Sequence, residues 1–428
     1  MSLGQLNIIS VIFYYNIIVN SLLGGIFIYY TDVSNPVLDK VNNESRTLGL
    51  YLILYTMIAF PIGVLIAKLL FFRIGDVGFL QRYQSKPLIG LIPGHNKLTR
   101  LTLTGLTTVC FMALCYVTFS IGIVPQLSLL SHLSHEEILR IRVMNSRAFP
   151  GLLFIKTIFF EQLTPLLSLV AYACYRLTKA HYDRCIFILL FVMSIYVVTF
   201  SLSKSTLVVY LAFFLFMHIY MVGRIPVLRF FILSVALLIL LIIMFFVITE
   251  QSVGDVVAYL VNRMFIDQVS GMYLMLQMFP DIYSFIGFDS LSSTISELIG
   301  NDMIQPSTRL AMEYAFPVAV AEGKMNLLST LFIGEAWANF GWFGVILSPF
   351  YVGLITGVVY YYTMAKRKTP LLLAFITYCS FGTNFSSQLN LYLYNSVMLA
   401  LIFILLAFYL ISVGMGLLLM KHYPTSGR

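Results

Sequence analysis

Long apolar runs recur along almost the whole chain, and they constrain its fold more than any other feature. About ten of these runs approach or exceed the roughly 20 residues that a helix needs to cross a bilayer. They lie at about 7–30, 48–70, 101–124, 151–175, 185–202, 205–222, 229–249, 341–364, 370–386 and 391–419. The sequence therefore predicts an all-α membrane helix bundle with about ten transmembrane helices.

The composition excludes a soluble protein. The 428 residues are 60% hydrophobic and 10% charged, whereas a typical soluble domain has roughly 25% charged residues. So few charges cannot cover the surface of a chain of this length. The net charge of +8 comes without a basic cluster interleaved with aromatic residues, so no nucleic-acid partner is expected. The cysteines and histidines show no metal-ligand spacing, so neither a metal nor another cofactor is expected.

The positions of lysine and arginine predict the orientation of the bundle. Basic residues gather in the C-terminal tail and in the loops at 73–100, 176–184, 223–229 and 365–369. With ten spans these loops all fall on one side, which the positive-inside tendency makes cytoplasmic, together with both termini. The larger loops on the opposite, outer side are then those at about 31–47, 125–150 and 250–340.

The spans divide the chain into three parts. Residues 1–249 are predicted to form an N-terminal bundle of about seven spans, and residues 341–428 the last three spans. Between them, residues 250–340 form one large external loop. Apolar residues at helical spacing from Val253 to Met278 predict an amphipathic helix on or near the membrane.

A second helix is predicted in the same loop. It runs from Arg309 to Ala321, with Ser307 or Thr308 as its N-cap.

Several arginines lie on the outer side, where the positive-inside tendency disfavours them. Arg142 and Arg147 have no acid three or four residues before them, whereas Arg140 has Glu136. A solvated helical loop with salt bridges is one interpretation of this segment. The other is an anion site, because the planar guanidinium binds phosphate through two parallel hydrogen bonds.

Two further outer arginines each precede an acid by four residues, Arg263 before Asp267 and Arg309 before Glu313. Local ion pairs are the simpler interpretation of both. A base that precedes its acid is the weaker order on a helix, which slightly favours other partners for the arginines.

The densest motif is Gly334-Glu335-Ala336-Trp337-Ala338-Asn339-Phe340-Gly341-Trp342-Phe343-Gly344. Its small residues permit close packing of helices or close approach of a substrate. One interpretation is a packed helix entry with an asparagine cap. The other is a site in which arginines stabilise a departing phosphate and a carboxylate or a histidine orients an attacking hydroxyl.

Lys204 lies in a polar break, 201–205, between two apolar runs. It is either part of a plain outer turn or a contact for a lipid phosphate.

The topology, together with Arg142, the run from Arg263 to Gly271 and the motif at 334–344, resembles the Wzy-type O-antigen polymerases, or oligosaccharide repeat-unit polymerases. The resemblance implies a GT-C-like glycosyltransferase of the bacterial inner membrane with its active site on the outer face. Its substrates would be undecaprenyl-diphosphate-linked oligosaccharides, donor and acceptor, in the lipid bilayer. A chain-length regulator protein is a further possible partner.

The resemblance also implies roles for individual residues. Arg263 and Arg309 would hold the donor diphosphate, and Arg142 or Arg147 would complete the clamp or hold the acceptor. Glu335 would orient or deprotonate the acceptor hydroxyl. We also assign three residues to substrate binding, namely Lys204, Asn339 and Glu313.

Three other functions compete with the polymerase. One is a purely structural or scaffolding membrane protein, against which the costly outer arginines argue. An O-antigen ligase-type enzyme would transfer a finished glycan to another acceptor, and loss of it would leave no repeat unit on that acceptor. A transporter or lipid flippase would have internal repeats and paired broken helices. We see no repeat in the sequence, and the long outer loop is asymmetric, so the polymerase is favoured.

Overall fold

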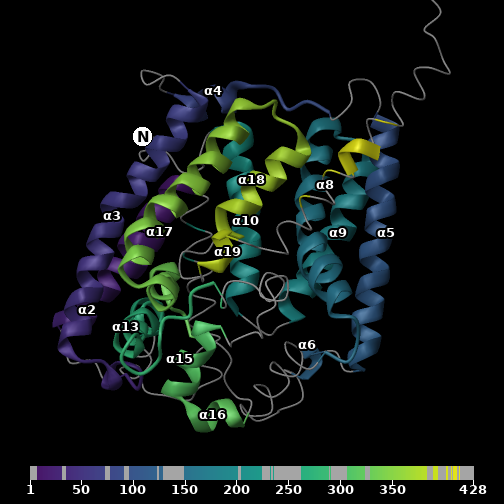
Figure 1. The fold of residues 1–428 in the computed structure, drawn as a ribbon. Helices are drawn as coiled ribbons and strands as arrows, with labels where there is room; N and C mark the ends of the chain where they lie inside the picture. The colour runs from purple at the N-terminus through teal and green to yellow at the C-terminus, as the bar shows by residue number, and fades with distance from the viewer. Residues whose placement is uncertain are drawn as a thin grey trace, which may run out of the picture. The chain divides into compact units, whose positions relative to one another are not determined.

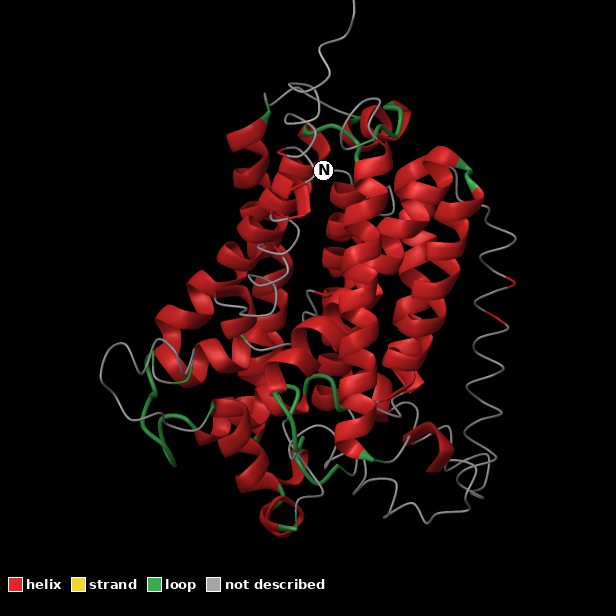
Figure 2. Cartoon of the chain, turned by 90° about the vertical axis from the view of Figure 1, so that its right-hand side faces the viewer, coloured by secondary structure: helices red, strands yellow, loops and turns green. Residues whose placement is uncertain are grey.

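The structure is a computed structural model (Figure 1). Besides a few isolated positions, it describes residues 7–30, 35–72, 78–90, 96–122, 125–128, 149–200, 204–223, 262–288, 306–322, 328–382 and 389–393. Within these ranges the chain consists of helices and loops without strands (Figure 2). It divides into two compact units, which we describe separately. Unit 1 comprises Met1–Phe79, Pro226–Ala365 and Gly382–Asn395, and unit 2 comprises Leu80–Ile225, Lys366–Phe381 and Ser396–Arg428.

The predicted helical membrane bundle is confirmed. Six stretches in the described residues are long and apolar enough to cross a membrane, namely Ile8–Tyr30, Asn43–Phe71, Lys97–Ile121, Ile155–Thr178, His181–Phe200 and Leu331–Ala365. Two shorter apolar helices are Thr206–Val222 and Pro370–Ser380. The runs at 229–249 and 391–419 lie largely outside the described residues, so the count of ten stays a prediction.

The helices of unit 1 are α1 (Ile8–Val11), η1 (Ile12–Leu22), α2 (Leu23–Tyr30), η2 (Leu38–Lys40), α3 (Asn43–Phe71), η4 (Asn262–Ile266), α13 (Ser270–Met278), α15 (Ser307–Ala315), α16 (Pro317–Ala321), α17 (Leu331–Ala365) and α19 (Asn390–Leu393). A capping box begins the first of them: Asn7 Oδ1 accepts the N–H of Ser10, and Ser10 Oγ accepts the N–H of Asn7. η1 is a π-helix that continues α1 into α2 without a break.

Helices α3 and α17 lie side by side in unit 1 (Figure 1). Two glycines let their backbones approach closely. A side chain at Gly63 would collide with the carbonyl of Phe350, and one at Gly353 would collide with the carbonyl of Phe60. Small residues at contacts of this kind are typical of packed membrane helices, where close van der Waals packing stabilises the pair.

The segment before α17 differs from the predicted amphipathic helix. A turn at 267–269 separates η4 from α13, and almost every residue of α13 is buried. Gly271 touches the carbonyl of Ser329, and the ring of Tyr273 lies against Gly49 of α3. The surface-helix prediction is therefore wrong for α13, because its small and polar positions face α3 and the loop before α17. Residues 253–261 lie outside the described residues.

The second helix predicted in this loop is divided in two. α15 ends at Ala315 and α16 starts at Pro317, whose ring cannot continue the first helix. The N-cap of α15 is Pro306, and the two predicted caps, Ser307 and Thr308, lie buried in its first turn.

The helices of unit 2 are α4 (Phe79–Ser85, whose first residue belongs to unit 1), α5 (Asn96–Ile121), α6 (Pro125–Ser128), η3 (Ile155–Leu163), α8 (Thr164–Thr178), α9 (His181–Phe200), α10 (Lys204–Val222) and α18 (Pro370–Gly382). A buried apolar cluster joins three of them near the ends of α5 and α9, and its members are Ala113, Val117, Phe160, Val197 and Phe200. This cluster fixes η3 at the end of the unit where α5 and α9 both end.

Candidate functional site

Helix α17 is broken inside the predicted motif. Gly341 has φ +55° and ψ −136°, a conformation that residues with a side chain rarely adopt. The part after the break, 342–365, extends about 36 Å at about 1.5 Å per residue, which is enough for roughly 30 Å of hydrocarbon. The predicted span at 341–364 matches this part. The preceding segment, 331–340, is an additional helical piece, and it carries Glu335 and Asn339.

The Glu335 carboxylate is completely buried, with 0% of the residue exposed. Its Oε2 atom accepts the backbone N–H of Asn390, 2.9 Å away, at the start of α19. Its Oε1 atom has no hydrogen-bond partner among the described residues. In the described part of the chain, no lysine or arginine pairs with this carboxylate. One oxygen is therefore held by the backbone, and no described residue uses the capacity of the other to accept a proton or a hydrogen bond.

Asn339 lies one helical turn after Glu335 and therefore on the same face of α17. Its Oδ1 atom accepts a 2.6 Å hydrogen bond from Ser290 Oγ. Its buried Nδ2 atom has no partner among the described residues, and neither do Oγ1 of Thr330 and Oδ1 of Asn390. A buried polar atom without a partner costs about 1–3 kcal/mol. These side chains thus offer hydrogen-bonding capacity that the described packing leaves unused.

The rest of the motif holds the segment in position. Trp337 Nε1 donates a 2.8 Å hydrogen bond to the carbonyl of Phe279, and the indole ring packs against Phe285 and Trp342. Gly334 lies against the backbone of Met272 in α13. The interpretation as a packed helix entry therefore explains most motif positions, but it does not account for the buried carboxylate.

Of the four arginines predicted to bind phosphate, the structure describes Arg263 and Arg309. Both form the local ion pairs that were the simpler interpretation. Arg263 Nη1 lies 3.3 Å from Asp267 Oδ2, and Arg309 Nε lies 2.7 Å from Glu313 Oε1. Asp267 also accepts a 3.2 Å hydrogen bond from Asn35 Nδ2. Because the base precedes its acid in both pairs, the sequence slightly favours other partners for these arginines. The structure does not show such partners among the described residues.

The remaining predicted site residues are not described in side-chain detail. Arg142 and Arg147 lie outside the described residues. Lys204 is the first residue of α10, but its side chain lies outside the described part. The structure therefore brings together Glu335 and Asn339, and in the same unit it pairs Arg309 with Glu313.

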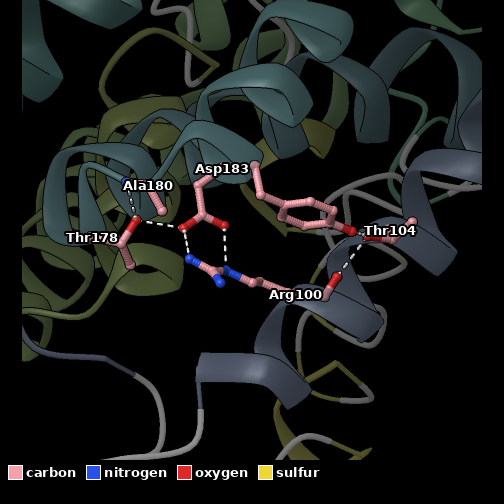
Figure 3. A network of polar contacts seen from close by, with 6 residues as sticks. Arg100, Thr104, Thr178, Ala180 and Asp183 are labelled. Atoms are coloured by element: carbon pink, nitrogen blue, oxygen red, sulfur yellow. Dashed lines mark hydrogen bonds and ion pairs between the residues drawn. The ribbon is translucent and has the colours of Figure 1, made fainter.

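Unit 2 contains a polar network that sequence reasoning missed (Figure 3). Arg100 of α5 forms two hydrogen bonds to the buried Asp183 of α9, Nε to Oδ1 at 2.9 Å and Nη2 to Oδ2 at 2.7 Å. The hydroxyl of Thr178 donates to the same carboxylate and accepts the N–H of Ala180. No sequence signal relates Arg100 to Asp183, because 83 residues separate them.

Comparisons with known proteins assign no family, because no family model, curated protein or solved structure matches the chain. The resemblance to repeat-unit polymerases therefore rests on the residues themselves.

Proposed function

We propose that this chain is a membrane glycosyltransferase that polymerises undecaprenyl-diphosphate-linked oligosaccharide repeat units at the outer face of a bacterial inner membrane. The observation that carries the proposal is the buried Glu335 carboxylate, which has one oxygen held by the backbone and the other without a partner among the described residues. This arrangement suits a general base, because the held oxygen fixes its orientation and the other accepts the proton.

In the proposed reaction, a hydroxyl oxygen at the nonreducing end of the acceptor attacks the anomeric carbon of the donor glycan. A new C–O bond forms, and the bond from the anomeric carbon to the diphosphate oxygen breaks. The hydroxyl proton passes to Glu335 Oε1, and undecaprenyl diphosphate leaves with the electron pair of the broken bond. Since Glu335 is fully buried, the proposal requires α19 to move away from α17 when the acceptor binds.

Arginines are proposed to neutralise the departing diphosphate. Arg263 and Arg309 hold the donor, and Arg142 or Arg147 completes the clamp or holds the acceptor. The first two are paired with acids here, but such partly exposed pairs contribute only about 0–1 kcal/mol. A diphosphate carries more negative charge than one carboxylate and therefore competes effectively for them.

The remaining site residues contact the substrate in the proposal. Asn339 offers its amide N–H groups, which have no partner in the described part of the chain, to a glycan hydroxyl beside Glu335. Glu313, once its arginine has turned to the diphosphate, accepts a hydroxyl of the glycan. Lys204 contacts a lipid phosphate from the start of α10.

The test replaces Glu335 by glutamine in the bacterium that makes the glycan. We expect Glu335→Gln to abolish chain extension, so that the gel ladder of long chains collapses to a single repeat unit. The matched control is Glu44→Gln, an exposed glutamate of the same unit, which keeps the full ladder. Immunoblots of the membrane fraction check that both variants accumulate equally.

Two results would reject the proposal. If the Glu335→Gln protein still makes long polymer, the base role is wrong. If deletion of the whole chain leaves no repeat unit on the acceptor, instead of one, the chain is a ligase-type transferase.

A further inference from the structure

A second pair of charges lies inside the membrane bundle, in unit 2. Lys156 Nζ and Glu161 Oε1 are 3.2 Å apart in η3, at the start of the candidate span Ile155–Thr178. Lys156 is 4% exposed, whereas the Glu161 side chain is 38% exposed. Ionisable groups within membrane spans are costly, and they commonly mark functional sites.

The pair exists because η3 is a π-helix. In an α-helix, two residues five apart point about 140° away from each other, so Lys156 and Glu161 would face different neighbours. In a π-helix, hydrogen bonds run from residue i to i+5 and bring these two side chains almost above one another. π-helical turns are rare and occur frequently at functional sites.

The apolar cluster described above places the pair at one end of unit 2. Phe160, the residue before Glu161, belongs to this cluster near the ends of α5 and α9. The N–H of Leu152 donates a 2.9 Å hydrogen bond to the hydroxyl of Tyr116, near the end of α5. Lys156 is therefore the second residue of its candidate span, and the ends of such spans are expected near the lipid head groups.

The pair differs from the Arg100–Asp183 pair of the same unit. There the acid is the buried member, and two hydrogen bonds together with Thr178 lock it. Here the acid is the more exposed member, and one contact of 3.2 Å joins it to a buried cation. The carboxylate can therefore turn outward while the ammonium stays in place.

We propose that Lys156 binds a phosphate group carried by a membrane lipid, and that Glu161 is an internal counter-ion that this phosphate displaces. A lysine ammonium binds phosphate as a point charge, and near the end of a span a lipid head group supplies that phosphate. Without a lipid, Glu161 neutralises the buried ammonium, which would otherwise carry the full cost of desolvation. The lipid is either a polyprenyl diphosphate or an anionic phospholipid, and the inference does not depend on glycosyl transfer.

The test measures lipid binding to the purified full-length chain by native mass spectrometry, with undecaprenyl diphosphate and phosphatidylglycerol as separate probes. We expect Lys156→Gln to weaken binding at least about tenfold. Glu161→Gln removes the competing anion and strengthens binding severalfold. Lys156→Arg keeps the cation and retains binding. Lys86→Gln, a lysine of the same unit outside the candidate spans, serves as the matched control and leaves binding unchanged.

The opposite effects of Lys156→Gln and Glu161→Gln distinguish this role from a purely structural ion pair, which both substitutions would damage alike. The double variant Lys156→Gln/Glu161→Gln is neutral and similar in shape, so it should fold and bind neither lipid. Retention of undecaprenyl diphosphate alone identifies the carrier lipid as the ligand, and retention of both probes identifies anionic lipids in general. Equal weakening by both single substitutions, or retention of neither lipid by the unmodified chain, overturns the inference.

Discussion

Each unit contains a deeply buried carboxylate, and the two have opposite surroundings. Asp183 of unit 2 is 2% exposed and accepts hydrogen bonds from the guanidinium of Arg100 and the hydroxyl of Thr178. Glu335 of unit 1 is 0% exposed, accepts a backbone N–H from Asn390, and has one oxygen without a partner in the described residues. Burial alone therefore does not distinguish a structural acid such as Asp183 from Glu335, for which we propose a function.

The difference lies in what offsets desolvation. The cost of removing a carboxylate from water is recovered when a cation and hydrogen bonds satisfy it in good geometry. Asp183 meets this condition, and it links α5 to α9 and to the end of α8. Among the described residues Glu335 has no cation and one hydrogen bond from the backbone, so its presence in the core is expected to lower stability. A chain that retains such a residue is expected to use it for chemistry or binding.

The largest effect on stability is expected at the structural acid. Asp183→Asn leaves the Arg100 guanidinium without its counter-charge and should lower the free energy of unfolding by about 3 kcal/mol. Unfolding of the detergent-purified protein by heat or denaturant measures the loss. In the Arg100→Gln background the same substitution should cost much less, since the partner is already absent. An equal cost in both backgrounds would show that the pair contributes nothing.

A buried cation extends the comparison to positive charge. Lys368 lies in the short loop of the chain that follows α17 and precedes α18. Its Nζ atom donates hydrogen bonds to the carbonyls of Gln84, at 2.8 Å, and Met221, at 3.2 Å. These carbonyls belong to the last turns of α4 and α10, where the helix dipoles are negative. Burial, followed by the charge of Lys86, lowers the pKa of Lys368 from 10.5 to about 8.

This lowered pKa predicts a pH dependence of stability. Between pH 8 and about 10.5, the unfolded chain retains the Lys368 proton that the folded chain has lost. Stability should therefore rise with pH across this window, by at most about 1.4 kcal/mol per pH unit. The free energy of unfolding, measured at several pH values, should lose this rise in Lys368→Met. Lys86→Gln removes a repelling charge, so the rise should shift to higher pH. An unchanged profile in Lys368→Met would exclude the effect.

The sequence correctly predicts those helices that consist of one long apolar run. The first five predicted runs match the helical stretches Ile8–Tyr30, Asn43–Phe71, Lys97–Ile121, Ile155–Thr178 and His181–Phe200. It leaves the helical segment 331–340 before the Gly341 break out of the predicted span, because Glu335 and Asn339 make that segment resemble a loop, although its residues are almost all buried. A hydropathy average falls wherever polar residues occur, and it does so even in a helix that is surrounded by protein and not by lipid.

The missed features depend on hydrogen bonding and on tertiary contacts. A π-helix has the same apolar composition as an α-helix, so nothing in the sequence predicts that Lys156 and Glu161 meet. The partner of Asp183 lies on another helix, and only the packed unit shows it. Glu335 could be selected from the sequence because a carboxylate among small residues at a membrane boundary is unusual.

The smallest expected effect on stability, and the sharpest for the comparison, is that of Glu335→Gln. Glutamine has nearly the same shape, and its oxygen can still accept the N–H of Asn390. The substitution removes a buried charge without creating a cavity, so the free energy of unfolding should stay equal or rise by up to about 1 kcal/mol. The same thermal or denaturant titration used for Asp183→Asn measures it. A protein that gains stability while it loses chain extension would show that Glu335 is kept for function at the expense of the fold. A loss of about 3 kcal/mol, comparable to that expected for Asp183→Asn, would instead make Glu335 a second structural acid.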